Sequence, residues 1–161
     1  MDLSEQDLKK IKSLHVMLKM PIWILERETN RVLKSYKSIY KHPISYEFKE
    51  KNISDEVVQF YSGMLNEIFL CLWYQDVRIV IGAFRINNVT STEFSHVYDN
   101  LTPENKKILS EKECWEYYSS LPVYPLGDIR DYLILLGFLF DMNLEEIYSE
   151  ELHKQVGENQ L

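Results

Sequence analysis

The residue types that most often carry catalytic or metal chemistry are few in this chain and widely spaced. It has two cysteines and four histidines: Cys71, Cys114, His15, His42, His96 and His153. No two of them stand at the spacing of a metal site, and no HExxH run occurs. The sequence also lacks the GxSxG turn of a nucleophilic serine and the glycine-rich loops that hold phosphates. We therefore expect no enzymatic activity, no catalytic residue, no metal and no cofactor.

A basic stretch at residues 34–51 interleaves lysines with aromatic residues, a pattern that could bind single-stranded nucleic acid. The stretch contains no arginine, and Glu47 and Glu50 dilute its charge. The whole chain carries 18 Lys+Arg against 25 Asp+Glu, a net charge of −7. Such an acidic protein is a poor match for a phosphate backbone. We expect a solvated loop here, and no binding of duplex DNA by the chain itself.

Aromatic residues are abundant, with eleven Tyr, seven Phe and three Trp. They could fill a large core, or some of them could line a pocket for a small molecule between sheet and helices. Gly82, inside an apolar run, would allow a close approach to the backbone. The candidate ligand-binding residues are Trp23, Tyr36, Phe69, Cys71, Trp73 and Tyr98. On a strand, the side chains of Phe69, Cys71 and Trp73 would share one face.

Hydrophobic periodicity and turn residues predict the elements that must position these side chains. Ser4 and Asp7 form a capping-box pattern at the start of the first helix, and Ser110 and Glu113 form another. The order of elements predicts an α+β fold, an antiparallel sheet of two hairpins with helices packed on it. The expected elements are a helix at 5–19, a hairpin at 22–25 and 31–36, a helix at 54–65, a hairpin at 68–74 and 77–86, and helices at 91–101, from 102, from 110 and at 126–141.

The helix at 126–141 is apolar around nearly its whole circumference from Tyr132 to Phe140. A helix that packs on one side of a monomer needs only one apolar stripe. A second copy of the chain could cover the other side, and so could C-terminal helices of the same chain that fold back. We expect a homodimer. Its predicted interface residues are Leu133, Leu135, Leu136, Phe138 and Phe140.

Length and charge suggest how the chain is organised. At 161 residues it is the size of one domain, which we place at residues 1–142. Residues 143–161 are strongly acidic and are expected to form a helical linker toward a DNA-binding domain that this sequence does not contain. The apolar run at 132–140 is too short to cross a bilayer, so no membrane partner is expected. Two cysteines without partner spacing suit the reducing cytoplasm.

Two segments resemble a known family. The run Phe69-Leu70-Cys71-Leu72-Trp73-Tyr74, a short turn and Val77-Arg78-Ile79-Val80-Ile81-Gly82-Ala83-Phe84 are similar to the hairpin of GAF/PAS-like sensory domains. The closer resemblance is to the N-terminal region of AraC-type transcription regulators from Gram-positive cocci, in which proline commonly stands where this chain has Ala83. The segment Tyr117-Tyr118-Ser119-Ser120-Leu121-Pro122, before the helix at 126–141, resembles a tyrosine–leucine–proline segment of the same family.

The resemblance implies a GAF/PAS-like domain that receives a signal and dimerises. A small-molecule effector would shift the helix after Pro125 and so reposition DNA-binding domains elsewhere in the regulator. The resemblance carries over no ligand-contact residue. Two other interpretations stay open: a free-standing binding protein or enzyme of similar fold, and a protein–protein adaptor with a filled core.

Overall fold

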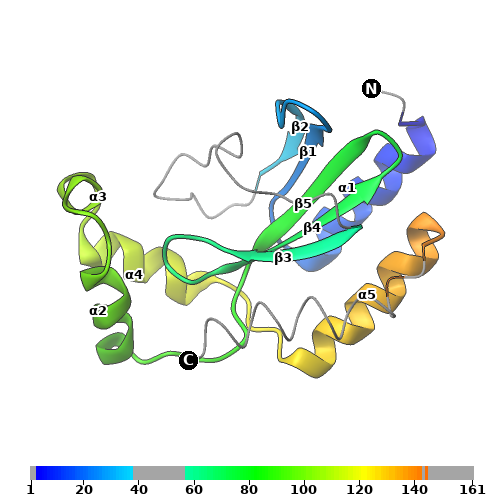
Figure 1. The fold of residues 1–161 in the computed structure, drawn as a ribbon. Coiled ribbons are helices and arrows are strands. Elements are labelled where there is room, and N and C mark those ends of the chain that lie inside the picture. The colour runs from blue at the N-terminus through cyan, green and yellow to red at the C-terminus, as the bar shows by residue number, and fades with distance from the viewer. Residues whose placement is uncertain (1–2, 38–56, 143, 145–161) are drawn as a thin grey trace.

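The computed structural model describes residues 3–37, 57–142 and 144, which form an α+β fold with one antiparallel sheet and helices on both of its faces (Figure 1). This confirms the predicted class of fold. In chain order the elements are α1 (Glu5–Leu18), β1 (Ile22–Glu26), β2 (Val32–Tyr36), β3 (Val58–Ser62), β4 (Ile68–Tyr74), β5 (Val77–Phe84), α2 (Ser91–Asp99), α3 (Pro103–Ile108), α4 (Glu111–Ser120) and α5 (Leu126–Phe140). The expected tail at residues 143–161 lies outside the described residues, apart from Leu144.

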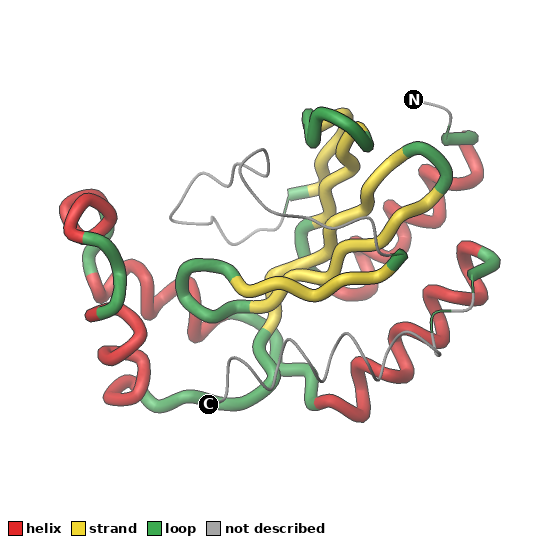
Figure 2. The backbone as a smooth tube through the Cα atoms, viewed as in Figure 1, coloured by secondary structure: helices red, strands yellow, loops and turns green. Residues whose placement is uncertain are grey.

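The five strands form a single sheet in the order β2-β1-β5-β4-β3, and all neighbouring strands are antiparallel (Figure 2). The two predicted hairpins, β1–β2 and β4–β5, are both present. They join because β1 pairs with β5, with Ile22 opposite Ile81 and Ile24 opposite Ile79. The last strand of the second hairpin therefore lies at the centre of the sheet.

The helix expected at 54–65 is wrong, since its described part forms strand β3 and a turn. Val58 and Phe60 pair with β4 and bury their side chains on one face, while Tyr61 packs on the other. This two-residue alternation is the pattern of a strand with both faces covered. Glu67 then holds the turn: its carbonyl accepts from Gly63 N–H at 2.7 Å and its carboxylate from Leu65 N–H at 3.1 Å.

Two hydrophobic clusters lie on opposite faces of the sheet. On the first face α1 and α5 pack against alternate residues of the strands, for example Leu70 and Leu72 of β4. On the second face α2 and α4 pack near Phe69 and Cys71 of the same strand. In Figure 1 the helices α2, α3 and α4 gather at one end of the sheet, and α1 and α5 lie at its other side. The central strands are therefore covered on both faces, as their apolar runs predict.

The start of α1 is fixed by the predicted capping box. The Ser4 hydroxyl accepts from Asp7 N–H at 3.1 Å, and the Asp7 carboxylate accepts from Ser4 N–H at 3.3 Å. The Tyr74 hydroxyl also donates to this carboxylate at 2.9 Å, which ties α1 to β4. Burial raises the pKa of Asp7, but the hydrogen bonds from Tyr74 and Ser4 outweigh it and leave the pKa below its ordinary value.

We expect Asp7→Asn to lower the free energy of unfolding by about 1 kcal/mol near neutral pH, because the cap and the Tyr74 bond lose an ionised acceptor. A carboxyl whose pKa is lowered by folding stabilises the protein above its unfolded-state pKa. That contribution is lost as the pH falls through the folded-state value. Urea unfolding near neutral pH and in acid should therefore show a difference that shrinks in acid. Glu5→Gln, an exposed first-turn control, should change stability less, and a difference independent of pH would contradict the assignment.

The chain reverses at the end of α5. Asp141 adopts a left-handed conformation with φ 53°, and Met142 N–H donates to the Gly137 carbonyl at 2.8 Å. A Cβ atom at residue 137 would lie 2.5 Å from the Met142 carbonyl oxygen, so this close return requires glycine. Leu144 follows and is buried in the first cluster.

Candidate functional site

The second face of the sheet gathers four of the six predicted ligand-binding residues. Phe69, Cys71 and Trp73 alternate along β4, and the register places Cys71 opposite Val80 and Trp73 opposite Arg78 on β5. Trp23 of β1 also lies opposite Val80, and its ring centroid is 6.2 Å from that of Phe69. These side chains therefore form one aromatic face across three strands.

The other two predicted residues are not part of this strand face, although Tyr98 on helix α2 packs against the second cluster. Tyr36 pairs with Ile22 and packs on the first face, where its ring centroid is 5.7 Å from that of His15 in α1. Tyr98 belongs to α2, and its hydroxyl donates to the Leu109 carbonyl at 2.6 Å. Alternation along the strands places Tyr36 and Trp23 on opposite faces, so Tyr36 cannot line the same pocket as Trp23.

At the end of this face away from α2 and α4, Trp73 lies close to two arginines. The Arg78 guanidinium carbon is 4.0 Å from the centroid of the Trp73 ring, and that of Arg27 is 4.5 Å away. Trp73 and Arg78 are each only 7% exposed. Within residues 3–37, 57–142 and 144, the indole Nε1 of Trp73 has no hydrogen-bond partner. We call these three residues the tryptophan–arginine cluster.

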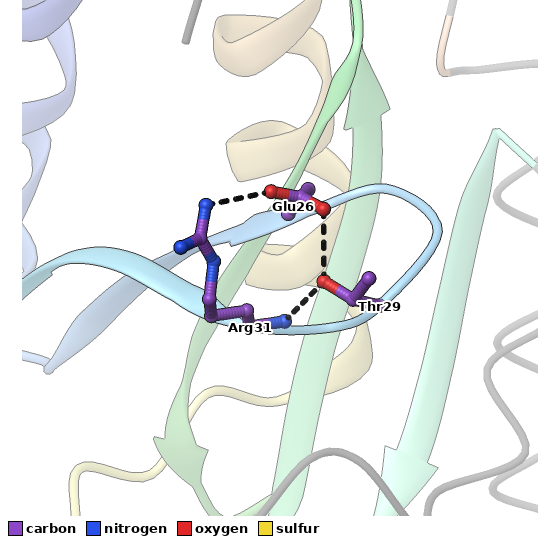
Figure 3. Close-up of polar contacts among 3 residues, drawn as sticks. All are labelled: Glu26, Thr29 and Arg31. Carbon is purple, nitrogen blue, oxygen red and sulfur yellow. Dashed lines mark hydrogen bonds and ion pairs between the residues drawn. The ribbon is translucent and has the colours of Figure 1, made fainter.

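The turn between β1 and β2 presents Arg27 to this cluster. On this turn the Arg31 guanidinium donates to the Glu26 carboxylate at 2.8 Å, and the Thr29 hydroxyl donates to the same carboxylate at 3.0 Å (Figure 3). These hydrogen bonds lower the pKa of Glu26, so the carboxylate keeps its charge. Glu26 N–H donates to the Arg31 carbonyl at 2.8 Å, and Asn30 adopts a left-handed conformation. The turn is thus a defined structure, and the side chain of Arg27 projects from it to Trp73.

The two cysteines do not provide reactive thiols. Burial raises the pKa of the Cys71 thiol strongly, and the opposing effects of the Tyr61 hydroxyl and Arg78 are smaller. Burial is also the largest cause of the raised pKa of Cys114, and acidic neighbours add to it. A thiol with a raised pKa holds little thiolate at neutral pH and is a weak nucleophile.

The described residues enclose little internal space on the first face. A cavity of about 20 Å³ lies between the sheet and α5, against Phe60, Tyr124 and Leu136. Two open grooves are larger. One of about 360 Å³ separates the first turns of α2 and α4 beside Trp115, and one of about 470 Å³ runs along α5 beside Phe138. The interior of the first face is therefore filled, and the larger hollows open to the surface.

The predicted interface residues on α5 divide between core and surface. Leu133, Leu136 and Phe140 are buried in the first cluster, so the sheet already covers them. Leu135 is 41% exposed and Phe138 is 82% exposed. Residues three, four and seven apart share a helix face, so Leu133, Leu136 and Phe140 all face the sheet. Leu135 and Phe138 lie on another side of the helix. The predicted interface is therefore reduced to Leu135 and Phe138 on this helix.

Helix α1 packs on the same face of the sheet as α5, and two hydrogen bonds join the helices. The Lys10 ammonium donates to the Leu139 carbonyl at 2.8 Å, and the Tyr124 hydroxyl donates to the Leu18 carbonyl at 3.2 Å. These bonds join opposite ends of the two helices, which run antiparallel. Val16 and Met17 on α1 are exposed, like Phe138 on α5. Each helix of this pair thus leaves large apolar side chains open to solvent.

Sequence reasoning missed the two arginines of the cluster. Arg78 interrupts the otherwise apolar run Val77–Phe84, and a charge inside a buried strand was the available signal. Arg27 had no such signal, because it reaches Trp73 only through the pairing of β1 with β5.

The described residues contain no group of side chains arranged to hold a metal ion. Among the described helices, none is long and apolar enough to cross a membrane. Searches with the chain match no family model, no curated protein and no solved structure.

Proposed function

We propose that this chain is the signal-input and dimerisation domain of an AraC-type transcription regulator, with a GAF/PAS-like arrangement. It would act in the cytoplasm and reach DNA only through a separate DNA-binding domain. Two features support the proposal. The segments that carry the resemblance form β4, β5 and the end of α4, and the antiparallel sheet with helices on both faces suits a sensory domain.

The observation that carries the dimerisation part is the exposure of Phe138. It is 82% exposed on a helix whose opposite side is buried against the sheet. Burying a phenylalanine side chain is worth about 1.5–3 kcal/mol. A partner that covers Phe138 would therefore be bound with that much additional stabilisation. Leu135, three residues earlier on the same helix, is also exposed and adds to the apolar area. A second copy of the chain is the proposed cover.

Strand β5, which forms part of the aromatic face, is connected to α5 through the chain and through hydrogen bonds. Arg78 and Val80 belong to β5, and Arg85 follows directly after this strand. The buried Arg85 guanidinium donates to the Leu121 carbonyl at 2.9 Å, and its backbone carbonyl accepts from Tyr124 N–H at 2.7 Å. The segment that leads into α5 is therefore clamped to the end of β5. An effector that moved β5 would also shift α5, provided that it bound the two arrangements with different affinities.

The test is to replace Phe138 by glutamate and measure self-association. We expect the parent chain to sediment as a dimer and Phe138→Glu to sediment as a folded monomer. Ile108→Glu is the matched control, because Ile108 is 77% exposed on α3, a helix that Figure 1 shows far from α5. The parent chain should also confer activity on a fused DNA-binding domain that represses a reporter only as a dimer, and Phe138→Glu should abolish it. A monomeric parent chain that is inert in the reporter would contradict the proposal.

The close packing of the second face, where Phe69 and Cys71 are at most 2% exposed, favours a second candidate, a protein–protein adaptor without an effector. In that role the 20 Å³ cavity would be ordinary packing space. Self-association would then persist, but no small molecule would change the activity of the fusion.

A further inference from the structure

We propose that the tryptophan–arginine cluster binds the carboxylate of a small molecule, which deepens the proposed signal-input function by naming the chemical class of its effector. The starting point is the indole N–H of Trp73. It belongs to a side chain that is 7% exposed, and it has no acceptor among the residues that the structure describes. A buried donor without an acceptor is unfavourable, and native proteins rarely leave one. A ligand oxygen at this position would satisfy it.

The charges around the indole specify an anion. Two guanidinium groups lie within 4.5 Å of the ring centroid. They favour a negatively charged acceptor, and charge-assisted hydrogen bonds from N–H groups to carboxylates are stronger than neutral ones. A cationic ligand would be repelled, and a neutral amide would accept only weaker hydrogen bonds from the arginines. A carboxylate can accept from the indole with one oxygen and from the exposed Arg27 guanidinium with the other.

A ligand could reach the Trp73 ring by displacing the exposed side chain of Arg27. Arg27 is exposed and extends from the β1–β2 turn, whereas Arg78 is buried on β5. Withdrawal of the Arg27 side chain would uncover the ring edge, and its return would close over a bound carboxylate. Arg78 would remain in place as the fixed cation. Binding would thus act directly on β5, the strand whose end is clamped to the segment before α5.

The experiment titrates the chain with acetate, propionate and phenylacetate and follows the tryptophan indole resonances by NMR. Phenylacetamide is the neutral isostere, and inorganic phosphate is the competing anion. We expect carboxylates to shift the indole resonance that Trp73→Phe removes, and phenylacetamide to leave it in place. Trp73→Phe keeps an aromatic ring for the arginines but lacks the N–H, so it should bind phenylacetate about tenfold more weakly.

Two matched controls and a second variant make the result interpretable. Trp115→Phe removes an indole of α4, at the other end of this face, and Lys12→Gln removes an exposed cation of α1, on the opposite face of the sheet. Both should bind phenylacetate like the parent chain. Arg27→Gln changes an exposed residue, should fold normally and should bind several-fold more weakly, so the test holds even if Trp73→Phe unfolds. Equal binding of phenylacetate and phenylacetamide, tighter binding of phosphate, or unchanged binding by Arg27→Gln would overturn the carboxylate site.

These outcomes are separate from those of the proposed function. Carboxylate binding by a chain that is monomeric and inert in the reporter fusion would leave the site standing and overturn the signal-input function. A dimer that is active in the fusion, with no response of the Trp73 resonance to any carboxylate, would overturn the site and leave dimerisation standing.

Discussion

Leu136→Ala is expected to lower the free energy of unfolding by about 2–5 kcal/mol, because it removes a fully packed side chain from the first cluster and leaves a cavity. Its sequence neighbour Leu135 provides a matched control with the same chemical change. Leu136 is 2% exposed and Leu135 is 41% exposed. In the dissociated chain, Leu135→Ala should cost about 0.5 kcal/mol or less. Urea unfolding at low protein concentration measures both values.

The same pair of variants also separates core from interface. If α5 packed on the sheet through its other side, Leu135→Ala would be the more damaging substitution, and the described packing would be refuted. If Leu135 lies in a dimer interface, the effect of Leu135→Ala should grow with protein concentration, because association adds to stability by mass action. The effect of Leu136→Ala should be large at every concentration.

Gly82→Ala is expected to lower the free energy of unfolding by about 1–3 kcal/mol. A Cβ atom at this position would lie 2.7 Å from Cδ1 of Phe69 and 3.0 Å from the Ile68 carbonyl oxygen. The neighbouring strand would have to move, and Phe69 is fully buried against the second cluster. Thermal or urea unfolding of the purified variant measures the loss.

Gly127→Ala is the control for Gly82→Ala. No atom lies within 4 Å of the position that a Cβ would occupy at Gly127, in the first turn of α5. Alanine there should raise stability by about 0.4–1 kcal/mol, since it restricts the unfolded chain and suits a helix. Opposite signs for the two glycines are the expected result, and a neutral Gly82→Ala would show that β4 and β5 are less tightly packed than described.

Features set by a few adjacent residues could be predicted from the sequence. The Ser4–Asp7 capping box and the Ser110 cap of α4 were recognisable because each joins residues three apart. The two hairpins followed from apolar runs separated by turn residues. The helix expected at 54–65 failed because its local capping signal was outweighed by the pairing of Val58 and Phe60 with β4, the strand that follows in the chain.

The candidate site was predictable only in part, for a related reason. Alternation along β4 correctly placed Phe69, Cys71 and Trp73 on one face. The contribution of Arg27 depends on the register between β1 and β5, which a single sequence does not specify. On α5 the apolar residues surround the helix, so nothing in the sequence indicated which of them face the sheet.

Strand β5 has a further consequence for how this protein can change over evolutionary time. All eight of its residues are buried, with side chains packed on both faces of the sheet and both edges paired to neighbouring strands. Almost any substitution there disturbs one of the two clusters, whereas the edge strand β2 has no fully buried residue. Divergence should therefore accumulate on β2 and on the outer sides of the helices, and the β4–β5 hairpin should be the segment by which distant relatives are recognised.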